Sequence, residues 1–249
     1  MSSPPLPGPN STPIIQPKRT RGCPELGPLA LMVSTQADLK MIQKQASLVK
    51  AGRAPLMSHL YVGTDSDFPV SVAGPMMGAP YAVAMMETLI AWGARSFLFF
   101  GWCGAISPEV GIGDIIVPTG SIIDEGTSRH YGMDTGRTSP AAREAVKQIE
   151  DILTGQELSF RKDIVWSTDA PFRETPEKVA DAHRQGAIAV EMETSALFTA
   201  GRHRQVSVGA VLAISDDLSS LTWKPGFKDK RFRNARRALC EGFARLCRM

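Results

Sequence analysis

The sequence predicts an α/β fold in which one sheet is covered by helices on both sides. Strand-like and helix-like segments alternate after residue 28, and such alternation is typical of α/β sheets. The run SFLFF at 96–100 is apolar enough to be buried on both faces, as strands in these sheets are. No break in composition and no repeat divides the chain beyond residue 28. We therefore expect a single domain over 29–249.

The first part of the chain predicts three strands and two helices. The segment LALMV at 29–33 is a short apolar strand candidate. Apolar residues at helical spacing predict a helix over 37–49. Strands at 59–63 and 68–74 are separated by the turn-prone GTDSD. A second helix over 80–92 has an apolar face, and the glycine that follows is a stop signal.

The middle of the chain continues the alternation around the apolar strand at 96–100. That strand leads into GWCGA, which we interpret as a glycine-flanked turn. The segments DIIVP at 114–118 and GSIID at 120–124 predict two further strands. A helix is expected over 140–153, and DIVWS at 163–167 is the next strand.

The last part of the chain follows the same pattern to its end. A helix over 176–185 precedes the strand AIAV at 187–190. A helix over 191–202 and the long apolar strand at 206–215 come next. The chain closes with an amphipathic helix over 228–247.

Composition argues against nucleic acid and membrane as partners. The chain has 249 residues, 43% of them hydrophobic, and a formal net charge of +3. It has no dense basic stripe with interleaved aromatic residues, which nucleic-acid binding would favour. The Arg-rich segment 228–237 is the local exception, and we interpret it as a solvated helix face or a subunit contact. The longest apolar runs, such as 204–214, are too short to span a membrane.

The cysteines and the N-terminal segment indicate a cytoplasmic protein. The cysteines are Cys23, Cys103, Cys240 and Cys247, none of them in a close CxxC pair. We therefore expect no metal site and no disulfide framework, which fits a reducing cytoplasm. The proline-rich segment 1–28 has no apolar central stretch, so we do not expect a signal peptide. It predicts a flexible N-terminal arm, with contact to a neighbouring subunit as the alternative.

Ligands of open α/β sheets bind beyond the carboxyl ends of the strands. Three stretches follow predicted strands there: GWCGA at 101–105, EMET at 191–194 and SDDLSS at 215–220. The glycine-rich stretch has neither dinucleotide-binding nor P-loop spacing, and a tight turn is its simpler explanation. These stretches are where we expect a functional site.

Glu191 and Glu193 stand between two apolar runs, where carboxylates are rare unless something pairs with them. On a helix they would diverge, so we expect one to face a ligand and the other to pair structurally. A carboxylate can accept from both hydroxyls of a vicinal diol and can stabilise nearby positive charge. The alternative is that both acids cap or pair near the start of a helix, where acidic side chains are favoured.

Asp216 and Asp217 directly follow a long apolar strand. A carboxylic acid here could protonate a leaving group if burial raised its pKa. The alternative is an Asx turn or a helix N-cap, for which Ser-Asp-Asp is also suited.

Taken together, four stretches resemble the nucleoside phosphorylase superfamily. They are GWCGAISPEVGIGDIIVP, DEGTSRHY, AIAVEMETSALF and AISD. That family contains purine nucleoside phosphorylase, uridine phosphorylase and methylthioadenosine nucleosidase, and the resemblance runs from about residue 29 to the end. It implies a three-layer α/β/α phosphorylase/hydrolase-like fold with a central mixed sheet. It also implies a homo-oligomer, whether dimer, trimer or hexamer.

The resemblance assigns roles to the carboxylates. It implies that Glu193 binds the ribose 2′- and 3′-hydroxyls, that Met192 packs beside the sugar, and that Asp216 is the acid that assists departure of a purine base. The further substrate-binding candidates are Glu191, Gly104, Trp102, Thr168, Phe172, Arg173, Arg129 and His130. Among them, Phe172 could stack on the base.

The chain departs from the family at the phosphate-binding positions. Phe99 and Trp102 stand where typical phosphorylases have an arginine and a serine or threonine. Phosphate needs cations and hydrogen-bond donors, which these side chains supply poorly. Possible substitutes as phosphate contacts are Lys40, Arg53 and Arg129, with Arg53 reaching in from a neighbouring subunit. Asp38 falls where nucleosidases hold water, but the arginine that accompanies it there is Leu212 here.

Three functions follow, in order of preference. The first is phosphorolysis of a purine-leaning nucleoside, with inorganic phosphate as co-substrate and no cofactor. The second is hydrolysis of the same N-glycosidic bond, motivated by Phe99 and Trp102. The third is a nucleoside-binding protein without catalysis.

Overall fold

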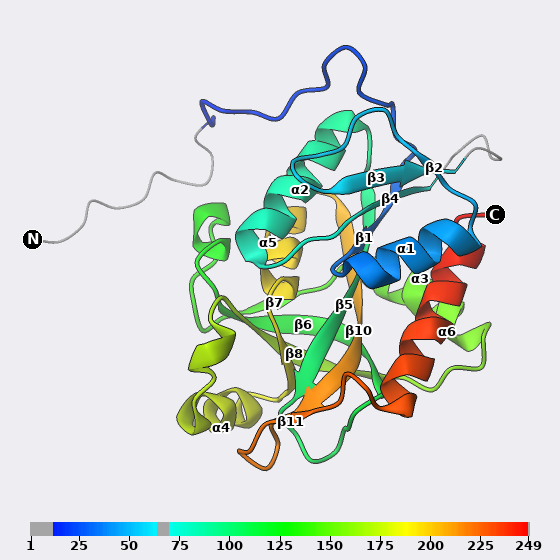
Figure 1. Cartoon of the computed structure of the whole chain (residues 1–249). Helices are drawn as coiled ribbons and strands as arrows, with labels where there is room; N and C mark the ends of the chain where they lie inside the picture. The colour runs from blue at the N-terminus through cyan, green and yellow to red at the C-terminus, as the bar shows by residue number, and fades with distance from the viewer. Residues whose placement is uncertain (1–11, 64–69, 249) are drawn as a thin grey trace, which may run out of the picture.

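The computed structural model describes residues 12–63 and 70–248. It shows a mixed, 11-stranded sheet with helices on both faces (Figure 1). The three-layer α/β/α arrangement expected from the sequence is therefore confirmed. No helix in the described ranges is long and apolar enough to cross a membrane.

The elements alternate in chain order. The strands are β1 (Leu29–Val33), β2 (Val49–Lys50), β3 (His59–Val62), β4 (Ser71–Gly74), β5 (Ser96–Ala105), β6 (Ile115–Asp124), β7 (Thr138–Pro140), β8 (Arg161–Thr168), β9 (Ala187–Glu191), β10 (Ser207–Asp217) and β11 (Lys224–Pro225). The α-helices are α1 (Gln36–Gln45), α2 (Ala79–Trp92), α3 (Arg143–Thr154), α4 (Pro176–Arg184), α5 (Thr194–Arg204) and α6 (Lys230–Leu246). Two 3₁₀ turns, η1 (Ser128–Tyr131) and η2 (Pro171–Arg173), complete the list.

Part of the sheet closes on itself. The strand order is β11-β10-β6-β8-β9-β5-β1-β4-β3-β2, and β10 also pairs with β5. The strands β5, β10, β6, β8 and β9 therefore form a ring, and β1, β4, β3 and β2 extend it as an open sheet. The pairs β1–β5 and β5–β10 are parallel, whereas β5–β9 is antiparallel. Strand β5 lies at the centre of this arrangement (Figure 1).

Strand β5 shows why the sheet is buried on both sides. Phe97 and Phe99 pack into the cluster that includes the apolar residues of α2 and α5. Leu98 and Phe100 point the other way, into the cluster formed with α1, α3 and α6. Side chains alternate between the two faces of a strand, so a continuous apolar run satisfies both helix layers. The prediction of a strand buried on both faces is confirmed.

The segment 101–105 is not a turn, as the sequence suggested, but the second half of β5. Its backbone pairs with β10 on one side, and its last residues pair with β9 on the other. Glycine is needed for close packing here, because a Cβ at Gly101 would lie 2.8 Å from the ring of Phe99. The predicted strands 114–118 and 120–124 are likewise one strand, β6, with an irregularity between Pro118 and Gly120.

Several other boundaries differ from the sequence prediction, and three of these differences move a named residue into another element. Helix α1 ends at Gln45, and Val49 belongs to β2. Helix α5 begins at Thr194, because Glu191 still belongs to β9. Strand β10 continues through Asp217, so the aspartates lie within the strand and not in a turn after it.

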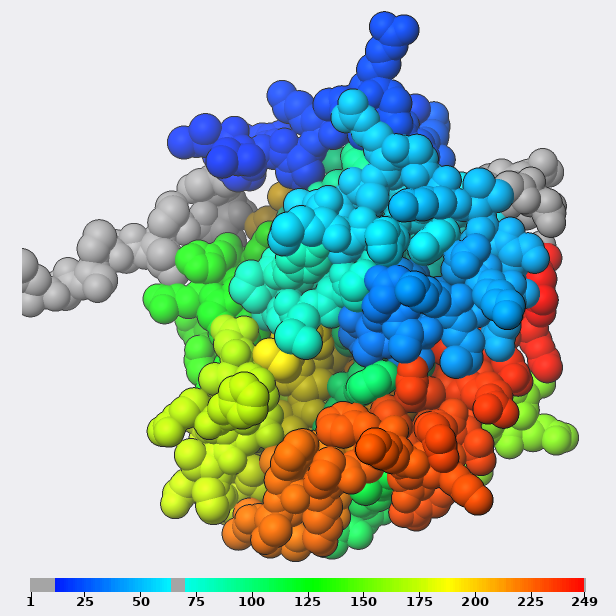
Figure 2. Space-filling model, viewed as in Figure 1, coloured from blue at the N-terminus to red at the C-terminus, as the bar shows by residue number. Residues whose placement is uncertain are grey.

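The N-terminal arm predicted for 1–28 is described from residue 12 onward, and 1–11 lie outside the described residues. Leu26 is buried, and its backbone N–H donates to the Trp92 carbonyl. Ile14 and Ile15 are fully exposed. Figure 2 shows this dark-blue segment on the outside of the molecule, at the top of the view. The division into an arm and one domain stays a prediction.

Candidate active site

Two of the stretches singled out in the sequence meet at the end of β5. Gly104 on β5 pairs with Asp216 on β10 and with Val190 on β9, directly before Glu191. Cys103, the residue before Gly104, lies near both stretches. Burial raises the pKa of its thiol well above the usual value, and the charges of Asp216 and Glu191 raise it further. The sheet therefore brings Asp216 and the two glutamates to one edge.

The Glu191 carboxylate is hydrogen-bonded to neighbouring groups of the protein. Its Oε2 accepts from the backbone N–H groups of Glu193 at 2.7 Å and Thr194 at 2.8 Å. Its Oε1 accepts from the hydroxyl of Ser167. The carboxylate thus satisfies free N–H groups at the start of α5, where acids are favoured. Burial raises its pKa, and these hydrogen bonds act in the opposite direction.

Glu193 is buried, and its carboxylate can still accept hydrogen bonds from a ligand. Its side chain is 6% exposed, and Oε1 accepts from the backbone N–H of Gly78 at the start of α2. The described hydrogen bonds to its carboxylate come from the backbone N–H groups of Gly78 and Met192, and no described side chain donates to it. Burial raises the pKa of Glu193, and the charge of Glu191 raises it further. A buried carboxylate to which no described side chain donates is suited to bind hydroxyl groups of a ligand.

A pocket of about 500 Å³ opens where β1 and β4 end. It includes Met77, the residue before the Gly78 that donates to Glu193. The described residues that line it are Ser34, Thr35, Gln36, Met57, Ser58, Pro75, Met76, Met77 and Tyr81. They supply hydroxyl and amide groups but no charged side chain, so this pocket fits a neutral polar ligand better than an anion.

Asp216 lies half-buried on β10 with both carboxylate oxygens occupied. Oδ1 accepts from the Ser215 hydroxyl at 2.6 Å, and Oδ2 accepts from the Trp223 indole N–H at 2.8 Å. Trp223 is 59% exposed and lies in the segment between β10 and α6. The sequence analysis did not single out Trp223. In the sequence, only its position a few residues after the SDD motif could have pointed to it.

Asp38 and Trp102 belong to a separate cluster with an arginine from the end of the chain. The Asp38 side chain is 1% exposed, and its Oδ1 accepts twice from the Arg236 guanidinium, at 3.0 and 2.6 Å. Its Oδ2 accepts from Trp102 Nε1 and from the Thr35 hydroxyl, each at 2.8 Å. The guanidinium also lies 4.5 Å from the Trp102 ring centroid, as in a cation–π contact.

This cluster has consequences for two predicted site residues. Both oxygens of Asp38 are already used, so the carboxylate has no free acceptor for a water molecule in this arrangement. The indole N–H of Trp102 is used as well. The sequence analysis missed Arg236 because it lies in the segment 228–237, interpreted there as a solvated face. It is instead half-buried on α6.

The other predicted residues lie at the rim or on the surface. Phe172 is 99% exposed on η2, and Thr168 is buried at the end of β8. Five basic residues are exposed: Lys40, Arg53, Arg129, His130 and Arg173. Arg53 donates to the Thr20 hydroxyl in the N-terminal segment. None of these cations forms a described hydrogen bond or ion pair with Glu193 or Asp216.

Glu174, one residue after η2, is a further titratable group at this edge that the sequence analysis missed. Its side chain is half-buried, and its pKa is raised to about 7 by burial first and by the charge of Asp216 second. No sequence signal distinguished it from the other acids near α4.

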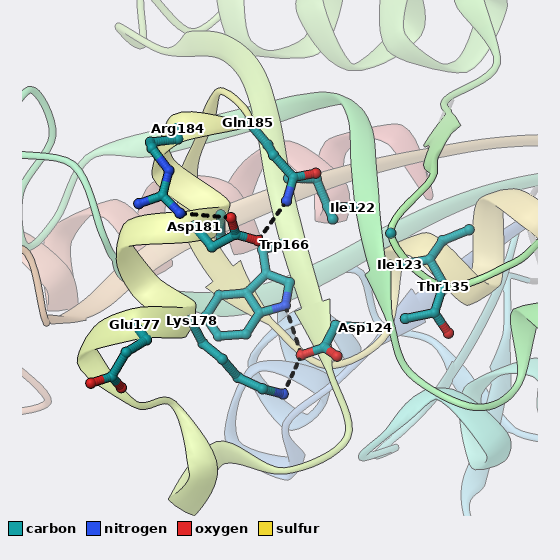
Figure 3. Close-up of a pocket in the computed structure, with 12 residues that line it drawn as sticks. Ile122, Ile123, Asp124, Thr135, Trp166, Glu177, Lys178, Asp181, Arg184 and Gln185 are labelled. Atoms are coloured by element: carbon teal, nitrogen blue, oxygen red, sulfur yellow. Dashed lines mark hydrogen bonds and ion pairs between the residues drawn. The ribbon is translucent and has the colours of Figure 1, made fainter.

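A second pocket, of about 460 Å³, lies between α4 and the strands β6 and β8 (Figure 3). Lys178 and the Trp166 indole both donate to Asp124 Oδ2 there, at 2.7 and 3.2 Å. Its lining contains none of the residues predicted for the site. The neutral pocket contains none of them either, but its Met77 precedes the Gly78 that donates to Glu193, so the carboxylate edge and this pocket remain the candidate active site.

Known sequences resemble this chain over much of its length. A family model described as "Phosphorylase superfamily" matches residues 28–246. A guanosine phosphorylase of Halorubrum lacusprofundi is 30% identical over 161 residues, which are 64% of this chain and 64% of that protein. A DeoD-type purine nucleoside phosphorylase of Bacillus cytotoxicus is 32% identical over 162 residues, which are 64% of this chain and 68% of that protein. The chain thus matches about two thirds of each relative's length.

Solved structures share the fold. Uridine phosphorylase from Vibrio fischeri has a TM-score of 0.77 at 22% identity, covering 95% of this chain and 99% of that one. AMP nucleosidase from Bacteroides thetaiotaomicron has a TM-score of 0.67 at 21% identity, covering 86% and 87%. The family match spans both carboxylate strands, the neutral pocket and α6, and the resemblance seen in the sequence is confirmed: this chain belongs to the phosphorylase superfamily.

Proposed function

We propose that the protein cleaves the N-glycosidic bond of a nucleoside. The observation that carries this proposal is Glu193, a buried carboxylate to which no described side chain donates, near a neutral, hydroxyl-lined pocket. The sugar diol would be bound there, and Met192 would pack beside it. Asp216 lies across Gly104 on the neighbouring strand, where the base would depart.

The chemistry of this bond fits two carboxyl groups on opposite sides. As the bond between C1′ and the base nitrogen breaks, its electron pair stays with the base and positive charge develops on the sugar. A carboxylate near the sugar stabilises that charge. A proton donor on the other side neutralises the departing base. Inorganic phosphate would then bond to C1′ and give ribose 1-phosphate.

Phosphorolysis of a purine nucleoside is our first candidate reaction. It is supported by the guanosine and purine nucleoside phosphorylases among the relatives. The pocket supplies donors for phosphate only as hydroxyl, amide and backbone groups. We propose that a homo-oligomer supplies the missing cation, with the exposed Arg53 of one subunit reaching the site of another.

Hydrolysis is the second candidate, and one specific observation favours it. Trp102 and Asp38, which stand near the expected anion position, are tied to each other and to Arg236. Arg236 is neutralised by Asp38 and is therefore a poor phosphate ligand. A water molecule needs no cation, so a neutral pocket would accept it more readily.

A nucleoside panel incubated with and without phosphate separates these reactions. If phosphorolysis is correct, free base and ribose 1-phosphate accumulate together, and activity disappears in phosphate-free buffer. Undiminished activity there, with free ribose as the product, would establish hydrolysis instead. Binding of a nucleoside by calorimetry without any release of base would indicate the non-catalytic alternative and overturn the proposal.

Gly104→Ala tests whether the end of β5 is part of the reaction site. A Cβ at Gly104 would lie 2.6 Å from Leu218 Cδ1 and 3.2 Å from Asp216 Oδ2. We expect kcat to fall by about 10²-fold, because small displacements of reacting groups are costly. Steady-state kinetics measure this effect. Gly111→Ala is the matched control, since a Cβ there meets nothing within 4 Å and should leave the rate unchanged. Equal rates for both variants would contradict the assignment.

A further inference from the structure

Trp223 donates a hydrogen bond to a carboxyl group of the candidate site. Its indole Nε1 lies 2.8 Å from Asp216 Oδ2. An indole N–H is a donor only, so Oδ2 accepts this bond whether or not Asp216 carries a proton. In a neutral carboxyl group the carbonyl oxygen is the better acceptor, so the proton of the acid form belongs on the other oxygen, Oδ1. The bond thus decides which of the two oxygens can give a proton to a ligand.

The surroundings of Oδ1 suit a group that gains and loses a proton. The Ser215 hydroxyl lies 2.6 Å from Asp216 Oδ1 and 3.2 Å from the Cys103 carbonyl oxygen, and it has one proton to donate. When Oδ1 is protonated, Ser215 can donate to the Cys103 carbonyl. When Oδ1 has lost its proton, Ser215 can donate to Oδ1 instead. Rotation of one hydroxyl therefore accommodates both forms of Asp216, with the Trp223 bond unchanged.

The chain between β10 and α6 folds back to place Trp223 beside Asp216. Strand β11 pairs antiparallel with the end of β10, so that Pro225 lies opposite Asp216. The backbone N–H of Gly226 donates to the Ser215 carbonyl at 2.9 Å. A Cβ at Gly226 would lie 2.7 Å from that carbonyl oxygen, so the close approach of the two segments needs glycine. The position of Trp223 is therefore fixed by the backbone of its own segment.

Aromatic packing holds the indole ring in this position. The centroids of the Trp223 and Phe227 rings lie 6.4 Å apart, with the ring planes at 60°. Phe227 in turn lies 6.2 Å from Trp102, whose indole is bound to Asp38. Trp223 is nevertheless 59% exposed, so it adds little to the core. Its hydrogen bond to Asp216 therefore explains its placement better than burial does.

We propose that Trp223 is a positioning residue that keeps on Oδ1 the proton that Asp216 gives to the departing base. This inference rests on the proposed function, because it concerns the proton donor of that reaction. As the bond between C1′ and the base nitrogen breaks, its electron pair moves into the base. The O–H bond at Oδ1 then breaks, its electrons stay on Asp216, and the proton bonds to a nitrogen of the purine ring. Asp216 takes up a proton from solvent before the next turnover.

The test compares Trp223→Phe with wild type on two purine nucleosides. Phenylalanine keeps an aromatic ring near Phe227 but has no N–H. On guanosine, whose base needs a proton to leave, we expect kcat to fall by about 10–10²-fold with KM little changed, because a misplaced reacting group is costly. The imidazole ring of 7-methylguanosine already carries the positive charge that protonation would supply. On that substrate the rate should stay within a few-fold of wild type.

Two further variants show whether Trp223 acts through Asp216. In an Asp216→Asn background, Trp223→Phe should cause no further loss on guanosine, because the acid that it positions is gone. Leu221→Ala is the matched control, since Leu221 is a similarly exposed residue of the same segment. It should behave as wild type on both substrates. Trp223→Phe and Leu221→Ala should both keep the wild-type melting temperature, as exposed substitutions usually do.

The inference is overturned if Trp223→Phe keeps the wild-type kcat on guanosine, loses activity equally on both nucleosides, or lowers the rate of Asp216→Asn further. A wild-type enzyme that cleaves only pyrimidine nucleosides overturns it as well, and leaves N-glycosidic cleavage standing. If wild type releases base from no nucleoside in the panel, the proposed function fails, and this inference fails with it.

Discussion

Replacing Glu193 with glutamine is expected to lower kcat/KM for the best nucleoside by about 10²–10³-fold. The variant keeps an oxygen that can accept from Gly78 but cannot ionise, whereas positive charge developing on the sugar favours the ionised form of Glu193. The melting temperature should stay the same or rise slightly. Burial raises the pKa of Glu193, so ionising it in the folded protein costs stability, and glutamine removes that cost. Steady-state kinetics and thermal unfolding at pH 7 measure the two effects.

Glu191→Ala is the matched comparison. We expect it to lower the stability of the fold, whereas Glu193→Gln lowers the activity. Glu191 accepts from the backbone N–H groups of Glu193 and Thr194 and from Ser167. Truncation leaves these buried donors without a partner, which should lower the free energy of unfolding by about 2–4 kcal/mol. Full activity of Glu193→Gln, or a large loss of its stability, would show that Glu193 is structural and has no role at the sugar.

Arg236→Met should produce the largest loss of stability, about 3–5 kcal/mol in the free energy of unfolding. Asp38 is 1% exposed and has no other cationic partner among the described residues. Removing the guanidinium therefore leaves a buried carboxylate without its counter-charge. A melting temperature about 10 °C below wild type would correspond to this loss. Urea unfolding followed by circular dichroism measures the free energy directly.

Two further variants make the Arg236 result interpretable. Arg237→Met changes an exposed neighbour on the same helix and should have little effect. Combining Asp38→Asn with Arg236→Met should recover part of the lost stability, because the buried charge is gone. If Arg236→Met unfolds at the wild-type urea concentration, the Asp38–Arg236 pair does not stabilise the fold.

Sequence patterns predicted the sheet and its helices well, but they misplaced the strand ends that form the site. The apolar run 96–100 reads as a strand by itself, whereas 101–105 reads as a turn because of Gly101 and Gly104. Those glycines are there because Leu212 and Leu218 pack against the backbone. This packing comes from residues distant in sequence, which local periodicity does not report.

Some residues of the site could likewise be predicted from the sequence, and others could not. Glu193 and Asp216 stand in recognisable motifs, and the structure brings their strands together at Gly104. Arg236 reaches Asp38 across 198 positions of sequence. Glu174 acquires its raised pKa from burial and from a strand that arrives later in the chain. Such partners depend on tertiary packing, so motif spacing could not have identified them.

The double pairing of β5 has a consequence for biosynthesis. This strand is apolar on both faces, yet one of its edges is completed only by β10, which the ribosome makes about a hundred residues later. Until then a nascent chain exposes an unpaired hydrophobic edge, the kind of surface that favours aggregation. The sheet around β5 can therefore be completed only after β10 has been synthesised.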